Sequence, residues 1–179
     1  MWMNTHDQYG LVARLLHWFI FMVVAGMLLG GIALSLLPPG GFRSFVVAGH
    51  KSFGVIVLFF VLVRLVWRNS NPTPKALGAE PVLNYSAHLV HVILYVLLIL
   101  QPFSGILMSQ AYGHPVAVFG LFTLPSLVWQ SPSAGAFFND VHSATAALLS
   151  IAIAIHAAAA VKHHYIDGDR TLMRMIKGR

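Results

Sequence analysis

Ten histidines stand in a chain that has only five acidic residues, and several of them interrupt long apolar segments. Ionisable side chains inside such segments are costly to bury and usually functional. His142 and His156 lie 14 residues apart, which on an α-helix is four turns less about 40°, so they share one face about 21 Å apart along the axis. One helix is therefore expected to present an imidazole at each of two levels.

Two further histidines match these levels when the apolar segments fold as antiparallel helices. His17 lies about one turn into the first segment, at the level of His156, and His50 begins the second segment at the other level. A zinc site would need three or four ligands at one point, and a hydrogen bond between helices explains a single membrane histidine. A haem iron needs one nitrogen on each side. The spacing therefore predicts two haems, bound by His17 with His156 and by His50 with His142.

The elements that carry these histidines are those of an integral membrane protein. The chain has 179 residues, of which 58% are hydrophobic and 9% charged, against roughly 25% charged in an ordinary soluble domain. Residues 15–42 contain no charge, and a spanning helix needs about 20 residues. We predict an all-α fold, with residues 1–179 as one four-helix transmembrane bundle. The expected helices cover about 11–37, 45–67, 85–108 and 141–163, with a loop at 69–81, a long loop at 112–138 and a tail at 166–179.

The basic residues predict the orientation of this bundle. The side that holds both termini carries nine of them, and the other side carries only Arg43 and Lys51. By the positive-inside rule both termini are cytoplasmic and the loop 112–138 is periplasmic, in a multi-pass protein of the bacterial inner membrane. The formal charge of +6 then reflects the orientation of the protein in the membrane and its contact with lipid headgroups, so no nucleic-acid partner is expected. The nine are Arg14, Arg64, Arg68, Lys75, Lys162, Arg170, Arg174, Lys177 and Arg179.

Other kinds of chemistry are excluded by what the chain lacks. It has no cysteine, which excludes disulfides, thiolate metal sites, iron–sulfur clusters and covalent haem attachment. No pairing of a nucleophile with a base is evident, so any reaction belongs to a bound cofactor. The first apolar segment is too long for a cleaved signal peptide and no A-x-A site follows it, so we expect it to remain as the first span.

Two cationic side chains are placed near the predicted haems by the same helical arithmetic. Arg64 lies 14 residues after His50, so it returns to the same face at the opposite level, where it would bind a haem propionate or extend to lipid headgroups. His163 lies seven residues after His156 and shares its face at the membrane edge. It is a candidate to hydrogen-bond a propionate or a quinone, with a solvated interfacial histidine as the alternative.

The remaining histidines give weaker predictions. His88 and His91 share a face of the third helix at its cytoplasmic end. They are alternative haem ligands, quinone contacts or ordinary interfacial residues. His6 and His114 lie outside the predicted helices, and we assign them no role.

Several short motifs are spread over nearly the whole chain. They are His17-Trp18, His50-Lys51-Ser52-Phe53-Gly54, Arg64-x-x-x-Arg68 with Pro72-Thr73-Pro74, Ala87-His88-Leu89-Val90-His91, and His156-Ala-Ala-Ala-Ala-Val-Lys-His163-His164-Tyr165. With these motifs the chain resembles the bacterial di-haem cytochrome b561 family. The resemblance implies two b-type haems with the same two ligand pairs, and it is weakest in the loop 112–138. The family is also similar to the cytochrome b subunits of respiratory hydrogenases.

This resemblance implies electron transfer across the membrane, from a periplasmic donor to ubiquinone near His163 and Arg14. Some members oxidise superoxide, so the expected activity is that of a superoxide:ubiquinone oxidoreductase, with Arg43 and Lys51 attracting the anion. A second interpretation is an electron-transfer subunit of a periplasmic dehydrogenase or hydrogenase, docked on the loop 112–138. A third, from another class, is a haem-free ion conductor lined by histidines.

Overall fold

The protein is described by a computed structural model that covers residues 1–77 and 81–178. Four of its helices are long and apolar enough to cross a membrane. The predicted all-α membrane bundle with four spans is therefore confirmed. Two sequence predictions touch residues outside the described part, namely residues 78–80 of the loop 69–81 and the basic residue Arg179. The elements are α1 (Leu11–Leu36), α2 (Gly41–Asn69), α3 (Pro81–Ala111), β1 (Ala117–Val118), β2 (Phe122–Thr123), α4 (Pro132–Tyr165) and α5 (Thr171–Ile176).

The spanning helices are longer than predicted at most of their ends. The largest correction is at α4, which begins at Pro132, so residues 132–138 are helical and do not belong to the long loop. Ser131 caps this helix, because its side chain accepts a hydrogen bond of 3.3 Å from the backbone nitrogen of Ala134. Proline at the first helical position already has the required φ. The loop therefore covers only residues 112–131.

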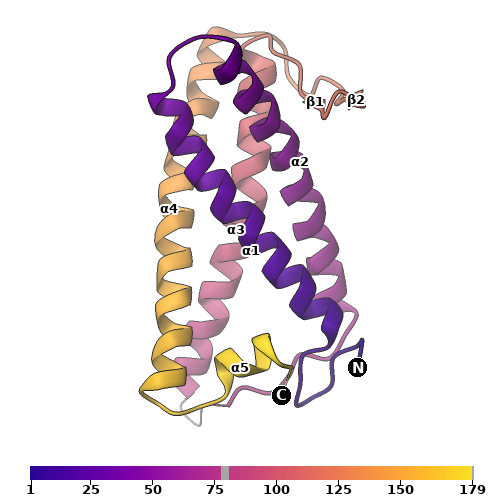
Figure 1. The fold of residues 1–179 in the computed structure, drawn as a ribbon, viewed down its shortest axis with the longest axis vertical. Coiled ribbons are helices and arrows are strands. Elements are labelled where there is room, and N and C mark those ends of the chain that lie inside the picture. The colour runs from indigo at the N-terminus through magenta and orange to yellow at the C-terminus, as the bar shows by residue number, and fades with distance from the viewer. Residues whose placement is uncertain (78–80, 179) are drawn as a thin grey trace.

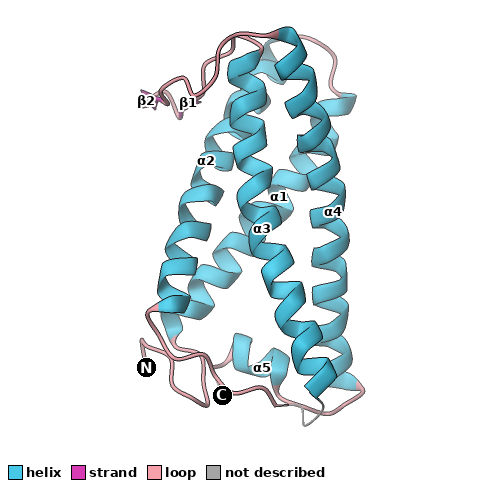
Figure 2. Cartoon of the chain, turned by 180° about the vertical axis from the view of Figure 1, so that it is seen from behind, coloured by secondary structure: helices cyan, strands magenta, loops and turns pink. Residues whose placement is uncertain are grey.

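The four spans follow one another around the bundle (Figures 1 and 2). α1 packs along α2, α2 along α3, and α3 along α4, whereas α1 and α4 are not among the closely packed helix pairs of the described residues. Both chain termini lie at the same end of the bundle, beside α5 (Figure 1). We call this the terminal end, and we call the opposite end, which carries residues 112–131, the loop end.

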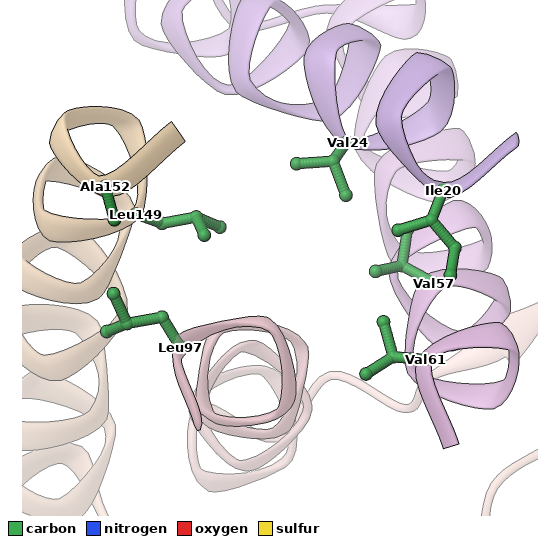
Figure 3. Packing of buried hydrophobic residues seen from close by; sticks show 7 residues of the cluster. All are labelled: Ile20, Val24, Val57, Val61, Leu97, Leu149 and Ala152. Atoms are coloured by element: carbon green, nitrogen blue, oxygen red, sulfur yellow. The ribbon is translucent and has the colours of Figure 1, made fainter. Parts of the chain in front are cut away.

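A cluster of buried apolar side chains lies in the middle of the bundle and receives residues from all four spans (Figure 3). On α4, Leu149 and Ala152 of this cluster lie between His142 and His156. The cluster therefore places apolar side chains between the two histidine levels. Its members are Ile20, Val24, Val57, Val61, Leu97, Leu149 and Ala152.

The loop 112–131 is fixed to the loop end by hydrogen bonds. It contains a short antiparallel hairpin in which Val118 pairs with Phe122. Ser52 of α2, which is buried, donates to the carbonyl of Ala117 at 3.3 Å and accepts from the backbone nitrogen of Phe119 at 2.9 Å. The side chain of Gln110 donates to the carbonyl of Pro125 at 2.9 Å. The hairpin is thus held against α2 and the end of α3.

At the terminal end, α5 ties the two ends of the chain together. The buried guanidinium of Arg174 donates to the carbonyls of Asp7 at 2.6 Å and Lys75 at 2.8 Å. Arg14 donates to the carbonyl of Ile176 at 2.6 Å. These bonds join the N-terminal segment, the segment after α2 and the tail in one layer below the spans.

Candidate functional site

The loop-end pair of histidines faces a cavity inside the bundle. The rings of His50 on α2 and His142 on α4 have centroids 6.4 Å apart, at an interplanar angle of 77°. Two imidazoles on opposite sides of one metal ion have ring centres about 6 Å apart, because each metal–nitrogen bond is about 2 Å long. The cavity that both residues line has a volume of about 770 Å³, within the range of about 300–1,000 Å³ typical of cofactor pockets.

A second cavity, of about 390 Å³, is lined by the same two histidines and by residues of α1 and α4. Small residues line it, including Gly31 and Ser35 of α1 and Ala147 of α4. It lies where α1 and α4 are not closely packed, so the space around the histidine pair extends between these helices. Its size and small lining residues fit a flat group held between His50 and His142.

The terminal-end pair has similar geometry and a third imidazole beside it. The ring centroids of His17 on α1 and His156 on α4 are 6.1 Å apart. His91 of α3 lies with its ring centroid 5.3 Å from that of His156, and its Nδ1 donates to the carbonyl of Ala87 at 2.6 Å. The structure thus brings His91 to this site, whereas His88 is exposed. The spacing of this pair also fits one metal ion between two imidazoles.

Arginine and tyrosine side chains accompany the terminal-end pair. Arg64 of α2 lies within electrostatic reach of His17 and His156. Its Nε donates to the hydroxyl of Tyr95 at 3.1 Å, and Arg68 lies over the ring of the same tyrosine, 5.8 Å from the centroid. The site is therefore cationic on its α2 side, which suits an anionic group. Sequence reasoning missed Tyr95, whose only available signal is a hydroxyl four residues after His91.

At the membrane edge, His163 is held by two carboxylates. Its Nδ1 lies 2.9 Å from Asp167 Oδ2 and 3.2 Å from Asp169 Oδ2. Hydrogen bonds from Lys162, and secondarily the neighbouring His163, hold the pKa of the exposed Asp167 carboxyl below its usual value. Nδ1 of His163 is therefore committed to the acidic turn after α4, and Nε2 is the nitrogen that remains for another partner.

The two loop-end cations lie beside the larger cavity. Arg43 and Lys51 both line it, together with Asn139 and His114. The Nζ of Lys51 is 3.4 Å from the carbonyl of Pro115, which places this cation against the loop. Two cationic side chains therefore line this cavity.

Three polar residues around His142 were missed by sequence reasoning. Gln101, Ser104 and Thr145 are buried or half-buried in apolar helices, and each makes hydrogen bonds at this level. They carry no charge and follow no periodicity. The one feature of the sequence that could have pointed to them is the position of Gln101 directly before Pro102.

Comparisons with known proteins identify the family of the chain. The model of the family described as prokaryotic cytochrome b561 matches residues 8–178. "Cytochrome b561 homolog 2" of Escherichia coli (strain K12) is 32% identical over 175 residues, which are 97% of this chain and 93% of the relative. "Probable superoxide oxidase CybB" of Yersinia pestis is 27% identical over 172 residues, 96% of this chain and 97% of the relative. "Cytochrome b561 homolog 1" of Escherichia coli (strain K12) is 28% identical over 167 residues, 92% and 94% of the two chains.

These matches cover nearly the whole chain and include all four spans, so the resemblance found in its motifs is confirmed. Membership implies a multi-pass bacterial membrane protein that uses haem b for electron transfer. The chain belongs to the prokaryotic cytochrome b561 family.

Proposed function

We propose that the protein is a di-haem cytochrome that carries electrons across the inner membrane, from superoxide in the periplasm to ubiquinone at the cytoplasmic side. The observation that carries this proposal is the presence of two imidazole pairs, with ring centroids 6.4 Å and 6.1 Å apart, at the two ends of one bundle. The excess of basic residues at the terminal end supports a cytoplasmic position for both termini.

Haem b would supply one-electron chemistry to both sites. In this proposal His50 and His142 would hold one haem at the loop end. His17 and His156 would hold the other at the terminal end, where Arg64 would bind a propionate. Because two histidines would bind each iron, substrates would exchange electrons with each site without binding the iron.

The terminal end is the proposed site of ubiquinone reduction. Two superoxide anions give up one electron each and leave as O₂, and one ubiquinone takes the two electrons with two cytoplasmic protons to form ubiquinol. The Nε2 of His163 faces the quinone carbonyl in this proposal, with its ring oriented by Asp167 and Asp169. Arg14, one turn before His17, adds a positive charge on the same side.

Superoxide as the donor is supported by charge and by the printed name of one relative. Arg43 and Lys51 line the cavity beside His50, and cations at the mouth of a cleft attract an anion and raise its rate of encounter. The Yersinia pestis relative is named a probable superoxide oxidase. We therefore assign the loop end to the oxidation of superoxide.

Stopped-flow spectroscopy of purified protein tests the two half-reactions separately. We expect about two haems per chain, reduction by superoxide, and reoxidation by added ubiquinone. The double variant Arg43→Gln/Lys51→Gln should slow reduction and flatten its dependence on salt, because attraction of an anion is screened over about 10 Å at 0.1 M. His163→Gln should spare reduction and slow reoxidation.

The matched control is Lys75→Gln/Arg170→Gln, which removes two exposed cations from the terminal end. It should leave the reaction with superoxide at the parent rate and salt slope. A double loop-end variant that behaves like this control would refute attraction by Arg43 and Lys51. A parent protein that superoxide does not reduce would refute superoxide as the donor.

A periplasmic dehydrogenase or hydrogenase is the second candidate donor, and the surface of the loop 112–131 favours it. Trp129 is 92% exposed and Leu121 81% exposed in this loop. Large apolar side chains on a loop outside the spans are typical of a docking surface. Co-purification of a periplasmic redox protein with the parent, and its loss in Leu121→Ser/Trp129→Ser, would favour this role over superoxide oxidation.

A further inference from the structure

The third span lacks one of its helical hydrogen bonds beside His142. Pro102 lies inside α3 and is buried there, and because proline has no N–H, the carbonyl four residues earlier lacks its helical partner. Gln101 precedes this proline, and Ser104 and Gly105 follow it within one turn. The segment 101–105 forms the surface against which the imidazole of His142 lies.

The main chain of α3 fixes which nitrogen of His142 carries the hydrogen. Nδ1 of this ring is 2.9 Å from the carbonyl oxygen of Gln101. A carbonyl only accepts, so Nδ1 is the donor and Nε2 keeps its lone pair. Ser104 Oγ donates to the same carbonyl at 2.9 Å and lies 3.2 Å from Nδ1. Two donors thus converge on one carbonyl beside the proline.

The side chain of Gln101 faces the other nitrogen of the ring. Its amide nitrogen is 3.2 Å from His142 Nε2, which agrees with a lone pair there. A haem iron would take this lone pair, so the amide nitrogen would give up the contact when a haem is bound. The amide oxygen accepts from the hydroxyl of Thr145 on α4, and Thr145 is buried, with its Oγ1 also 2.8 Å from the carbonyl of Val141. This bond ties Gln101, whose main-chain carbonyl accepts from Nδ1, to α4 one turn beyond His142.

Gly105 completes this environment by leaving room for the ring. A Cβ at this position would lie 2.9 Å from Cε1 and 3.1 Å from Nδ1 of His142. At His50 the corresponding contacts are ordinary, since a Cβ on Gly30 or Gly31 would lie 3.8 Å or 3.7 Å from that ring. Of these three glycines, only Gly105 lies so close to an imidazole that a Cβ would meet it.

We propose that Gln101, Gly105 and Thr145 are positioning residues that fix the tautomer and ring orientation of His142. This rests on the proposed function, in which His142 is an axial ligand. A ligand histidine that donates its second N–H to a carbonyl is held in one orientation and is a stronger donor to the metal. Stronger donation favours the oxidised iron and lowers the reduction potential of the loop-end haem.

The hydrogen bonds of His142 should make the two proposed haems different from each other. Among the four proposed ligands, His142 alone has hydrogen-bond partners within residues 1–77 and 81–178. Loss of the positioning residues should therefore change the loop-end haem and leave the terminal-end haem as it is. This difference separates a positioning role from a general structural role.

Two matched pairs of variants test the proposal. Gly105→Ala places a methyl group against the His142 ring, whereas Gly26→Ala on α1 meets nothing within 4 Å. Thr145→Val removes the hydroxyl that orients Gln101 at nearly constant volume, whereas Thr145→Ser keeps it. The measurements are haem per chain by pyridine haemochrome, the electron paramagnetic resonance spectrum of each ferric haem, and the midpoint potential of each spectral component.

In Gly105→Ala we expect either loss of one of the two haems or a shift of the loop-end resonance, with the terminal-end component unchanged. In Thr145→Val the loop-end midpoint should rise, while Thr145→Ser and Gly26→Ala keep the parent values. If Gly105→Ala does not fold, the threonine pair decides. The proposal is wrong if Thr145→Val keeps the parent loop-end potential or shifts both components equally. A parent chain without haem would instead overturn the proposed function itself.

Discussion

The two histidine pairs share one spacing but differ in the residues around them. His142 lies among uncharged hydrogen-bonding groups, with Gln101 contacting both ring nitrogens. His156 lies beside His91 and within reach of the positive charge of Arg64. A charge near the iron and a hydrogen bond to its ligand both affect haem spectra and potentials. The two proposed haems should therefore be spectroscopically distinct.

Substitution of the α4 histidines tests this assignment one residue at a time. We expect His142→Ala to remove the loop-end haem and His156→Ala to remove the terminal-end haem, because each variant would leave only one histidine to hold that haem. Low-temperature spectra and haem content of both variants are the measurement. Loss of the same spectral component from both would mean that the pairing is wrong.

The carboxyl of Asp167 gives a prediction about pH. Hydrogen bonds from Lys162 hold its pKa below the usual aspartate value, so the ionised form is the one favoured in the folded protein. The contribution of this contact to stability is present above the usual aspartate pKa and is lost as the pH falls through the lowered one. Carboxyl NMR of the parent should show the lowered midpoint.

The variant Lys162→Gln should return the Asp167 midpoint toward the usual value, and His163→Gln should move it less, since Lys162 is the larger cause. An unchanged midpoint in Lys162→Gln would show that another group sets the pKa.

Among the single helices, α4 has one face in the apolar cluster and another on the outside of the bundle. Leu149 is 1% exposed in the apolar cluster, and its neighbour Leu148 is 54% exposed on the outer face. Leu149→Ala should destabilise the protein by about 2–5 kcal/mol, because it removes a side chain that is buried among apolar neighbours. Leu148→Ala should change stability by less than about 0.5 kcal/mol. Thermal unfolding in mild detergent compares the two, and equal effects would contradict the packing in the structure.

The existence of the four spans could be predicted from the sequence, but several of their ends could not. Uncharged segments such as residues 15–42 reveal a span directly. The sequence predicts a loop at the start of α4, because three prolines between residues 112 and 138 favour irregular structure. Pro132 instead begins the helix behind the Ser131 cap. Local capping decided this boundary, and hydropathy does not detect it.

Part of the candidate site could be anticipated in the same way. Histidines in apolar helices are conspicuous, and helical spacing relates His142 to His156 directly. Gln101 and Tyr95 act through contacts between helices, with His142 and Arg64 respectively. Such contacts depend on how α3 packs against its neighbours, which residue spacing within one helix does not determine.

At the scale of the whole molecule, the charge distribution predicts which end faces the cytoplasm. Because the chain has no cysteine, single cysteines can be introduced at exposed positions in each end. In intact cells whose outer membrane is permeabilised, Leu121→Cys should react with a membrane-impermeant maleimide, and Thr171→Cys should react only after the inner membrane is broken. Both positions are exposed. The reverse pattern would invert the proposed orientation.

The apolar cluster in the middle of the bundle affects how much net charge each turnover would move across the membrane. Electrons tunnel through packed hydrocarbon, whereas protons need a continuous chain of hydrogen-bonding groups, and Val61 and Leu149 offer none. Under the proposed function, an electron that moves inward therefore crosses without a compensating proton. Each such charge works against an inside-negative potential by up to about 2.3 kcal/mol per 100 mV. Turnover in sealed vesicles would then generate a voltage and slow as that voltage builds up.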